Sequence, residues 1–293
     1  YALNLDGTLN WSSANLNEDV QDGPWGSSPL HPAIDANGNI YVQGQHHVSS
    51  FYPNGTLRWE NRSSTLNYAG SPSIFQDTVY FPSGDTDNVH IYAFDTNGTF
   101  KWRFTRNEPG GNNKFNMISF DAAGNLYAGT DNETFFAINP DGSLRWTYTF
   151  PTGNAKVRQN VAIDSDGTIY VGTKNDQNSE FCALHANGTL KWKYTAPLQD
   201  VYSSPTITSD GSIWFATEDR YVFRLDKTQG YLKEKFEIQE DVTWCSCSFT
   251  TSGTMYIGDL GGFLYKVDFP GINVANVPWP CIGASMLRTR FLS

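Results

Sequence analysis

FAINPDGSLRW (residues 136–146) decides the fold, because close copies of it recur along the chain. Four further copies keep the glycine and the tryptophan four residues later: YALNLDGTLNW (1–11), SFYPNGTLRW (50–59), YAFDTNGTFKW (92–102) and CALHANGTLKW (182–192). Two degenerate copies follow, FRLDKTQGYLK (223–233) and YKVDFPGINVA (265–275), which makes seven. The tryptophans are 48, 43, 44 and 46 residues apart, so one structural unit is repeated along nearly the whole chain.

A second motif lies between these copies. It reads AIDANGNIYV (33–42), PSIFQDTVYF (72–81), SFDAAGNLYA (119–128), AIDSDGTIYV (162–171), TITSDGSIWF (206–215) and SFTTSGTMYI (248–257). Apart from 72–81, which has no glycine, each copy places apolar residues on both sides of a glycine turn, which is a hairpin signal. Two hairpins per period give four strands. The sequence therefore predicts an all-β fold, a seven-bladed β-propeller of four-stranded antiparallel blades; a solenoid is the alternative for repeats of this length.

The glycine and the tryptophan have separate predicted roles. The glycine provides the positive φ of a tight turn, and the tryptophan fills the gap between adjacent blades. Seven outer hairpins but six inner ones leave the first blade without its inner strands. Either residues upstream of Tyr1 are missing, or the tail after Ala275 supplies these strands. We expect a propeller over 1–275 and a tail over 276–293 that packs on it or closes it.

Composition and charge exclude several partners. The net charge is −10 and basic residues form no run, which argues against sequence-independent binding of nucleic acid. No apolar segment approaches the roughly 20 residues that span a bilayer. We therefore expect neither a nucleic-acid partner nor membrane insertion.

Six N-glycosylation sequons and four cysteines bear on the compartment. Asn54, Asn97 and Asn187 occupy a turn position where other copies carry aspartate, so turn chemistry explains them. The sequons at Asn10, Asn61 and Asn132 lack that explanation and predict a secreted or extracellular glycoprotein. The cysteines lack CxxC spacing; they are either small buried residues or include a bridge from Cys281 to Cys245 or Cys247.

One end of the blades is expected to carry the binding site. The hairpin turns are short and alike, whereas the connections between hairpins and between blades vary in length, and variable loops on a rigid scaffold usually hold the site. Counting back nine residues from the inner-hairpin glycines places a ring at the mouth of the central channel: Pro29, Phe115, Arg158, Tyr202 and Trp244. Two positions further on are His31, Met117, Asn160, Ser204 and Ser246.

These rings predict a ligand platform with stacking aromatics and directional hydrogen bonds. The ligand-binding residues are expected to be Phe115, Arg158, Asn160, Tyr202, Trp244 and His31. The alternative is that the same side chains only plug the channel.

Two loops hold further candidates. His46 and His47 are the most conspicuous acid/base pair, and we include them in the ligand-binding set; neighbouring residues on a strand point to opposite faces, which argues against a shared site. Asp85, Asp87 and Asn88 offer oxygen ligands to calcium, although the EF-hand spacing is absent and acidic loops are commonly just solvated.

The paired pattern, Gly-x-[Ile/Leu]-Tyr followed by Tyr-Ala-[Leu/Phe]-[Asn/Asp]-x-x-Gly-x-x-x-Trp, resembles the PQQ-like (quinoprotein-like) β-propeller repeat. The tail VPWPCIGASMLRTR (277–290) is similar to a segment that flanks such propellers. The resemblance implies the fold but leaves the function open among quinoprotein dehydrogenases, outer-membrane assembly scaffolds and extracellular modules. The dehydrogenases carry adjacent cysteines, whereas Ser246 separates Cys245 from Cys247 here, which argues against quinone binding.

Three functions remain as hypotheses. The first is a secreted, non-catalytic propeller without a cofactor that binds a glycan or an extracellular protein through its variable loops. The second is an enzyme, either a PQQ-dependent dehydrogenase or a polysaccharide lyase with His46, His47, Tyr202 or Arg158 as candidate groups. The third is a structural module that assembles into a larger extracellular array.

Overall fold

The computed structural model describes residues 2–4, 6–12, 31–44, 46–64, 66, 70–85, 87–108, 115, 117–175, 178–194, 198–242 and 245–276. The chain divides into two compact units, residues 1–118 with 286–293, and residues 119–285. The tail over 276–293 lies, except for Asn276, outside the described residues.

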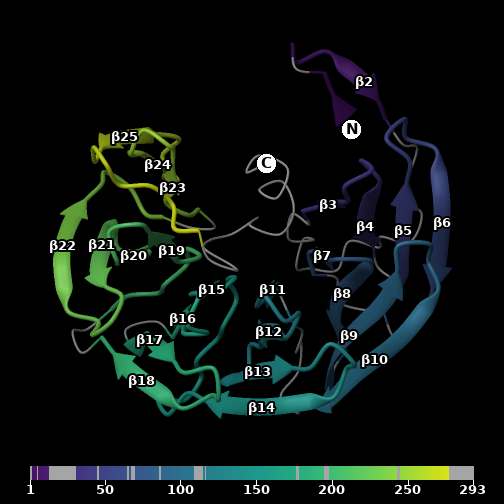
Figure 1. Cartoon of the computed structure of the whole chain (residues 1–293), viewed down its shortest axis with the longest axis horizontal. Coiled ribbons are helices and arrows are strands. Elements are labelled where there is room, and N and C mark those ends of the chain that lie inside the picture. Colours follow the sequence, from purple (N-terminus) through teal and green to yellow (C-terminus); the bar gives the residue numbers. More distant parts are fainter. Residues whose placement is uncertain are drawn as a thin grey trace. The chain divides into compact units, whose positions relative to one another are not determined.

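The described residues form seven antiparallel sheets, five of which have four strands, as the sequence predicts (Figure 1). The first unit holds β1 (Ala2–Leu3) and β2 (Leu9–Trp11); β3 (Ala33–Ile34), β4 (Ile40–Gly44), β5 (His47–Phe51) and β6 (Leu57–Arg62); and β7 (Ser73–Phe75), β8 (Thr78–Gly84), β9 (Asn88–Asp95) and β10 (Phe100–Asn107).

The second unit begins within β11 and continues the series with four more sheets. Its strands are β11 (Ile118–Phe120), β12 (Leu126–Gly129), β13 (Thr134–Ile138) and β14 (Leu144–Thr149); β15 (Ala162–Ile163), β16 (Ile169–Gly172), β17 (Phe181–Leu184) and β18 (Leu190–Lys193); β19 (Thr206–Thr208), β20 (Ser212–Ala216), β21 (Tyr221–Asp226) and β22 (Leu232–Glu237); and β23 (Ser248–Phe249), β24 (Thr254–Gly258) and β25 (Leu264–Asp268). In the three four-stranded sheets of this unit, inner and middle strands are almost wholly buried, whereas outer strands consist mainly of exposed and half-buried residues. β23 and β24 are only partly buried.

In four outer-hairpin turns, the Asp or Asn side chain directly before the glycine closes the turn. In the turn after β13, Asp141 Oδ1 accepts hydrogen bonds from the backbone N and Oγ of Ser143, at 2.9 and 2.6 Å. Asn187 and Thr189 make the equivalent pair of bonds in the turn after β17. The sequons at Asn54 and Asn187 therefore have the turn geometry of Asp-Gly-Ser, as predicted. In the turn at Asn97 the acceptor is Asp95 instead, which receives the backbone N of Asn97 and Thr99.

The inner-hairpin turns use an aspartate that also holds a tyrosine. Asp121 Oδ1 accepts from the backbone N of Asn125 at 2.9 Å, while its Oδ2 accepts from Tyr127 Oη at 3.0 Å. Asp35 and Tyr41 repeat this arrangement in the first unit. Burial, together with the charge of Asp35, raises the pKa of Tyr41 to about 12, so its hydroxyl remains a donor at neutral pH.

Each outer-strand tryptophan that can be followed inside one unit packs on the turn glycine of the next sheet. Trp146 Nε1 donates to the carbonyl of Ala186 at 3.0 Å, and its ring lies where a Cβ on Gly188 would stand, 2.6 Å away. Trp11, Trp59 and Trp192 make the same contacts with the turns that contain Gly55, Gly98 and Gly230. The predicted packing between neighbouring sheets is confirmed.

The prediction of a seventh outer hairpin over 265–275 is wrong. Only β25 forms there, and Val274 makes an isolated antiparallel bridge with Thr208 instead. The backbone N of Ala275 donates to the carbonyl of Ile207 at 2.9 Å, so this segment lies on the inner edge of the sheet that contains β19. Ala275 stands where five of the other copies have tryptophan and offers no ring to pack on a following turn.

Three of the four cysteines lie among the described residues. Cys182, Cys245 and Cys247 have free thiols, and Cys281 lies outside the described residues. Burial raises the pKa of the Cys247 thiol to about 12, so this side chain behaves as a small apolar group. Within the described part of the chain, we find no helical segment with the length and apolarity to cross a membrane.

Gly188 must adopt a positive φ and must also leave room for the Trp146 ring, which gives a testable prediction. Gly188→Ala should destabilise the protein by about 3 kcal/mol, because a left-handed alanine costs about 1 kcal/mol and overpacking against the Trp146 ring costs about 2 kcal/mol. Gly211→Ala is the matched control: its φ is also positive, at 75°, but nothing lies within 4 Å of its Cβ position, so about 1 kcal/mol is expected. Chemical unfolding midpoints measure both, and equal losses would refute the role of the tryptophan.

Candidate functional site

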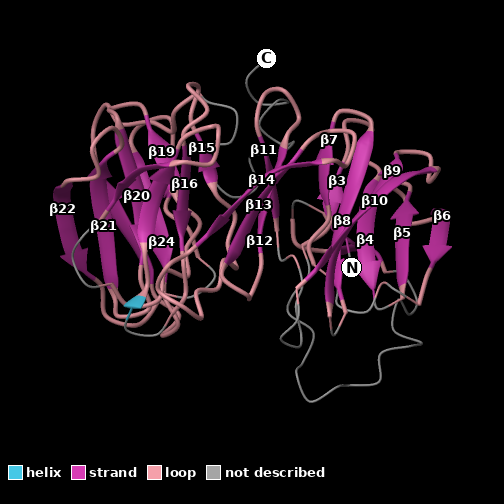
Figure 2. Cartoon of the chain, turned by 90° about the horizontal axis from the view of Figure 1, so that it is seen from below, coloured by secondary structure: helices cyan, strands magenta, loops and turns pink. Residues whose placement is uncertain are grey.

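The connections of uneven length in the second unit are joined to one another at one end of its strands. In Figure 2 the strands of this unit run between two sets of loops. Lys156, in the connection after β14, pairs with Lys174, which follows β16. Val201, in the connection after β18, pairs in the same way with Thr217, which follows β20. Backbone bonds between loops therefore fix where this end presents its side chains.

Glycines at strand ends anchor the same connections. A Cβ on Gly172, the last residue of β16, would stand 2.4 Å from Cγ1 of Val201. Gly129, the last residue of β12, meets Val157 in the same way. The valine side chains thus occupy the space that a larger residue would fill, and each valine directly precedes a predicted site residue, Arg158 or Tyr202.

Arg158 and Tyr202, predicted from the repeat register, come together with Lys174. Arg158 donates from Nε and Nη2 to the two carboxylate oxygens of Asp131, at 2.9 and 2.7 Å. This ion pair, with a further hydrogen bond to Tyr202, raises the pKa of Arg158. Lys174 Nζ lies 4.8 Å from the centroid of the Tyr202 ring, so the tyrosine sits between two cations.

The carboxylate partner of Lys174 is Asp200, whose side chain is 3% exposed. Asp200 also accepts hydrogen bonds from the Asn175 backbone and from Ser179 Oγ, each at 2.9 Å. Burial disfavours the charged form of Lys174, but its bonds to Asp200 and Tyr202 outweigh that cost and raise its pKa. We call Asp131, Arg158, Lys174, Asp200 and Tyr202 the loop-end cluster; each of its two cations lies against one of its two carboxylates.

The other predicted ring residues lie in different surroundings. Phe115 has no exposed surface and packs on Phe104, so it offers no free face for stacking. Asn160 is buried, and its Oδ1 is 3.5 Å from Ser119 Oγ. His31 is exposed, and its backbone N donates to Ser71 Oγ at 3.1 Å. Pro29 and Trp244 lie outside the described residues.

The side chains of the two adjacent histidines, His46 and His47, lie in different surroundings. His47 is 4% exposed, and its ring occupies the place of a Cβ on Gly44, as valine does at Gly129 and Gly172. His46 adopts a φ of 64° and lines a hollow of about 340 Å³ with Arg62 and Ser63. The two rings therefore do not form a shared acid/base site here.

One of the predicted calcium ligands, Asp85, is occupied by hydrogen-bond donors. Asp85 accepts from the backbone N of Asp87 and Asn88, and its Oδ2 lies 3.0 Å from Nε2 of the buried His90. Burial would raise the pKa of Asp85, but these bonds, that of His90 foremost, lower it to about 2. Among the described residues, we find no group of three or more acidic, histidine or cysteine side chains placed to hold a metal ion.

The three sequons with no turn explanation differ in their contacts. Asn10 is exposed on β2. The Asn61 side chain donates from Nδ2 to the carbonyl of Gly98 at 3.0 Å, and Asn132 is half-buried beside β13.

Comparison with known proteins identifies the family of this chain. The family model described as "Outer membrane protein assembly factor BamB" matches residues 1–230. The chain belongs to this family of PQQ-like β-propeller repeats. A comparison with the curated proteins finds no match.

Solved structures of propellers with little sequence identity share the BamB-like fold of this chain. BamB from Moraxella catarrhalis aligns with a TM-score of 0.60 and 14% identity over 84% of this chain and 73% of that protein. Sqt1 from Saccharomyces cerevisiae aligns with a TM-score of 0.65 and 12% identity over 87% and 73%. The Dos1 propeller aligns with a TM-score of 0.64 and 11% identity over 85% and 75%. The recognition of the repeat and the all-β propeller fold are confirmed.

Asp85 allows the calcium prediction to be tested against a purely structural role. Its depressed pKa stabilises the fold at pH values above the ordinary carboxyl value of 3.8, and this contribution is lost as the pH falls through about 2. Asp85→Asn should therefore cost about 1 kcal/mol at neutral pH, after allowance for solvent screening, with the difference closing towards pH 2. Unfolding with calcium or with a chelator should give the same midpoints. A calcium-dependent rise that Asp85→Asn abolishes would support the metal site instead.

Proposed function

We propose that this BamB-like propeller is a non-catalytic binding module that recognises a protein partner through the loop end of its second unit. The observation that carries the proposal is the convergence of Arg158, Lys174 and Tyr202 from three separate connections. Tyrosine and arginine are the residue types that most often dominate protein interfaces. Their positions are fixed beforehand by Asp131 and Asp200, which reduces the entropy lost on binding.

A protein partner is favoured over a glycan by the state of the aromatic rings. Sugar stacking needs an open ring face, whereas Phe115 is fully buried and Tyr202 is 9% exposed beneath Lys174. The matching family model describes an assembly factor, a protein that acts with other proteins, which supports the same choice.

The loop-end cluster also favours binding over acid/base chemistry. A general acid or base works best with a pKa near the operating pH. The pKa values of Arg158 and Lys174 are raised away from that range, and each cation is held by a carboxylate. These shifts suit a charged recognition surface.

Site-specific crosslinking tests the proposal. A photoreactive residue at Glu240, exposed in the connection after β22, should capture a protein from the native source, whereas one at Gln229, exposed in the turn after β21, should not. With the captured protein purified, Arg158→Ala should weaken binding at least tenfold and Gln229→Ala should leave it unchanged. Arg158→Lys keeps the charge but loses the two-pronged bond, so an intermediate loss is expected. Equal crosslinking from both ends, or capture of glycans alone, would refute the proposal.

We further propose that the protein is an extracellular glycoprotein, on the evidence of the sequons at Asn10, Asn61 and Asn132. The protein purified from its native source should lose mass on enzymatic deglycosylation, with Asn10 carrying the highest occupancy because its side chain is exposed. Asn61 should carry the lowest, since its amide is bonded to Gly98. Peptide mass spectrometry reads each site separately. An unmodified native protein would contradict the proposed compartment.

A further inference from the structure

In both units, the residue two positions after an outer-strand tryptophan faces the next sheet of the same unit. In the second unit it is a tyrosine in both places where the contact lies within the unit. Tyr194, two residues after Trp192, meets the Phe223 ring of β21 edge-on, with centroids 5.9 Å apart. Tyr148, two residues after Trp146, is half-buried near Cys182 of β17, the residue that corresponds to Phe223 in the repeat. A ring therefore fills this slot between sheets.

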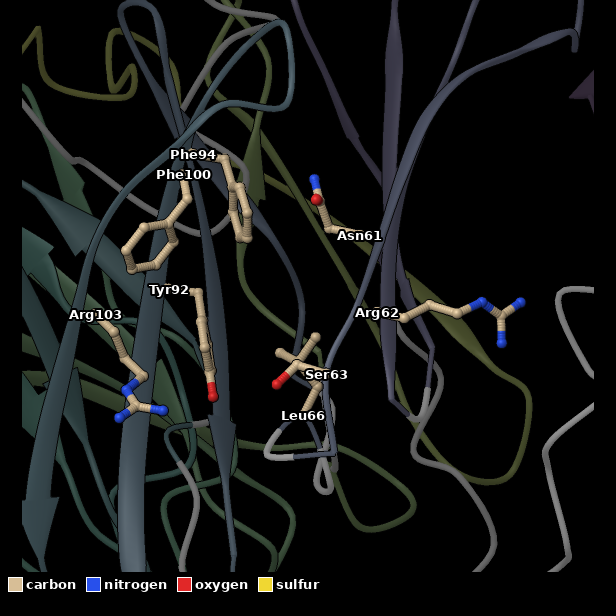
Figure 3. A pocket seen from close by; sticks show the side chains of 8 residues that line it. All are labelled: Asn61, Arg62, Ser63, Leu66, Tyr92, Phe94, Phe100 and Arg103. Atoms are coloured by element: carbon tan, nitrogen blue, oxygen red, sulfur yellow. The ribbon is translucent and has the colours of Figure 1, made fainter.

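In the first unit the same slot is open. Asn61, two residues after Trp59, stands where the second unit has tyrosine, and it lines a cavity together with Tyr92, the residue of β9 that corresponds to Phe223. This cavity has a volume of about 480 Å³, which lies within the range of roughly 300–1,000 Å³ typical of ligand pockets. Figure 3 shows Tyr92, Phe94 and Phe100 on one wall and Asn61 and Ser63 on the other.

The aromatic wall is suited to receive one more ring. Phe94 is fixed by Trp59, with centroids 6.2 Å apart, and meets Phe100 edge-on at 5.7 Å. Tyr92 and Phe94 are each 5% exposed, whereas Phe100 is 54% exposed at the rim of the cavity, so Phe100 is the ring that an incoming side chain would meet. Edge-to-face and offset contacts of this kind are the arrangements that aromatic pairs prefer. An incoming ring would continue the sequence of contacts that Trp59 begins.

Arg103 gives the cavity a charge preference. Its guanidinium lies 5.8 Å from the Tyr92 centroid, and within the described part of the chain no carboxylate lies at ion-pair distance from it. In the second unit the corresponding residue is Lys193, which follows Trp192 as Arg103 follows Trp102. Its Nζ lies 3.1 Å from Oε1 of Glu180. A guanidinium that has no carboxylate partner among the described residues, beside a cavity with one aromatic wall, favours an anionic group on the occupant.

We propose that this cavity binds the side chain of a tyrosine or phenylalanine from a protein partner, next to an acidic residue that pairs with Arg103. The occupant takes the place that Tyr148 and Tyr194 fill within the chain itself. This site is separate from the loop-end cluster, so the two proposals fail independently.

A tripeptide comparison tests the preference. The probes are acetyl-Glu-Tyr-Glu-amide, acetyl-Glu-Ala-Glu-amide, acetyl-Lys-Tyr-Lys-amide and N-acetylglucosamine, titrated into the full chain from a host that does not glycosylate. Binding is followed by NMR and calorimetry. The first peptide should bind in the millimolar range and at least tenfold more tightly than the other three probes. Absence of this order, or tighter binding of the sugar, overturns the proposal.

Variants locate the binding. Asn61→Tyr should fill the slot with the side chain found in the second unit, keep or raise the melting temperature, and weaken the Glu-Tyr-Glu peptide at least tenfold. Asn61→Ala leaves the slot open and is the matched control, with binding retained. Arg103→Gln should remove the preference for Glu over Lys beside the tyrosine. If Asn61→Tyr fails to fold, Phe100→Ala at the exposed rim provides the second measurement, with an expected loss of at least fivefold. Unchanged binding in the variant measured overturns the assignment.

Discussion

The contact between an outer-strand tryptophan and the turn glycine of the next sheet is the constraint on which the described structure depends. The indole ring covers the glycine, and its N–H donates to a carbonyl of the same turn, as Trp146 does at Gly188 and Ala186. The glycine is thus required twice, for its positive φ and for the absence of a Cβ. Because each contact joins neighbouring sheets, stability within a unit is a sum over successive interfaces.

This constraint divides the chain into a turn end and a loop end. Turn residues must close the turn and also receive a tryptophan, so few residue types are suitable, and Asp, Asn, Gly and Thr recur there. The described connections at the loop end of the second unit are held by backbone pairing, such as that between Val201 and Thr217, and by the glycine–valine contacts at the ends of β12 and β16. Other side chains in such loops are less constrained than those of the turns, which favours binding residues at that end.

Sequence reasoning succeeded where the physics is local. Hairpins whose glycine, aspartate and tyrosine lie within ten residues of one another, such as the one closed by Asp121, formed as predicted. It failed at 265–275, where the glycine of the motif is present but the backbone after it pairs with β19 instead of returning along β25. The register placed Arg158 and Tyr202 at one end of the strands, but their partners could not be read from the sequence. Asp131 lies 27 residues from Arg158, and Lys174 lies 26 from Asp200. The glycine–valine anchors were missed too, although the recurring glycine at the ends of β12 and β16 was a usable signal.

A repeat makes each departure from its pattern informative, because equivalent positions have equivalent surroundings. Cys182 and Phe223 are each covered by a tyrosine from the preceding sheet, whereas Tyr92 is faced by Asn61. A tyrosine in this slot would add about 2 kcal/mol to the free energy of unfolding through apolar burial. The single hydrogen bond from Asn61 to Gly98 adds only about 1 kcal/mol. The isolated chain would thus be more stable with a tyrosine at this position. A net loss of this kind is balanced when the missing ring arrives on another molecule, so the open slot between β6 and β9 is better explained as part of an interface than as a defect of the fold.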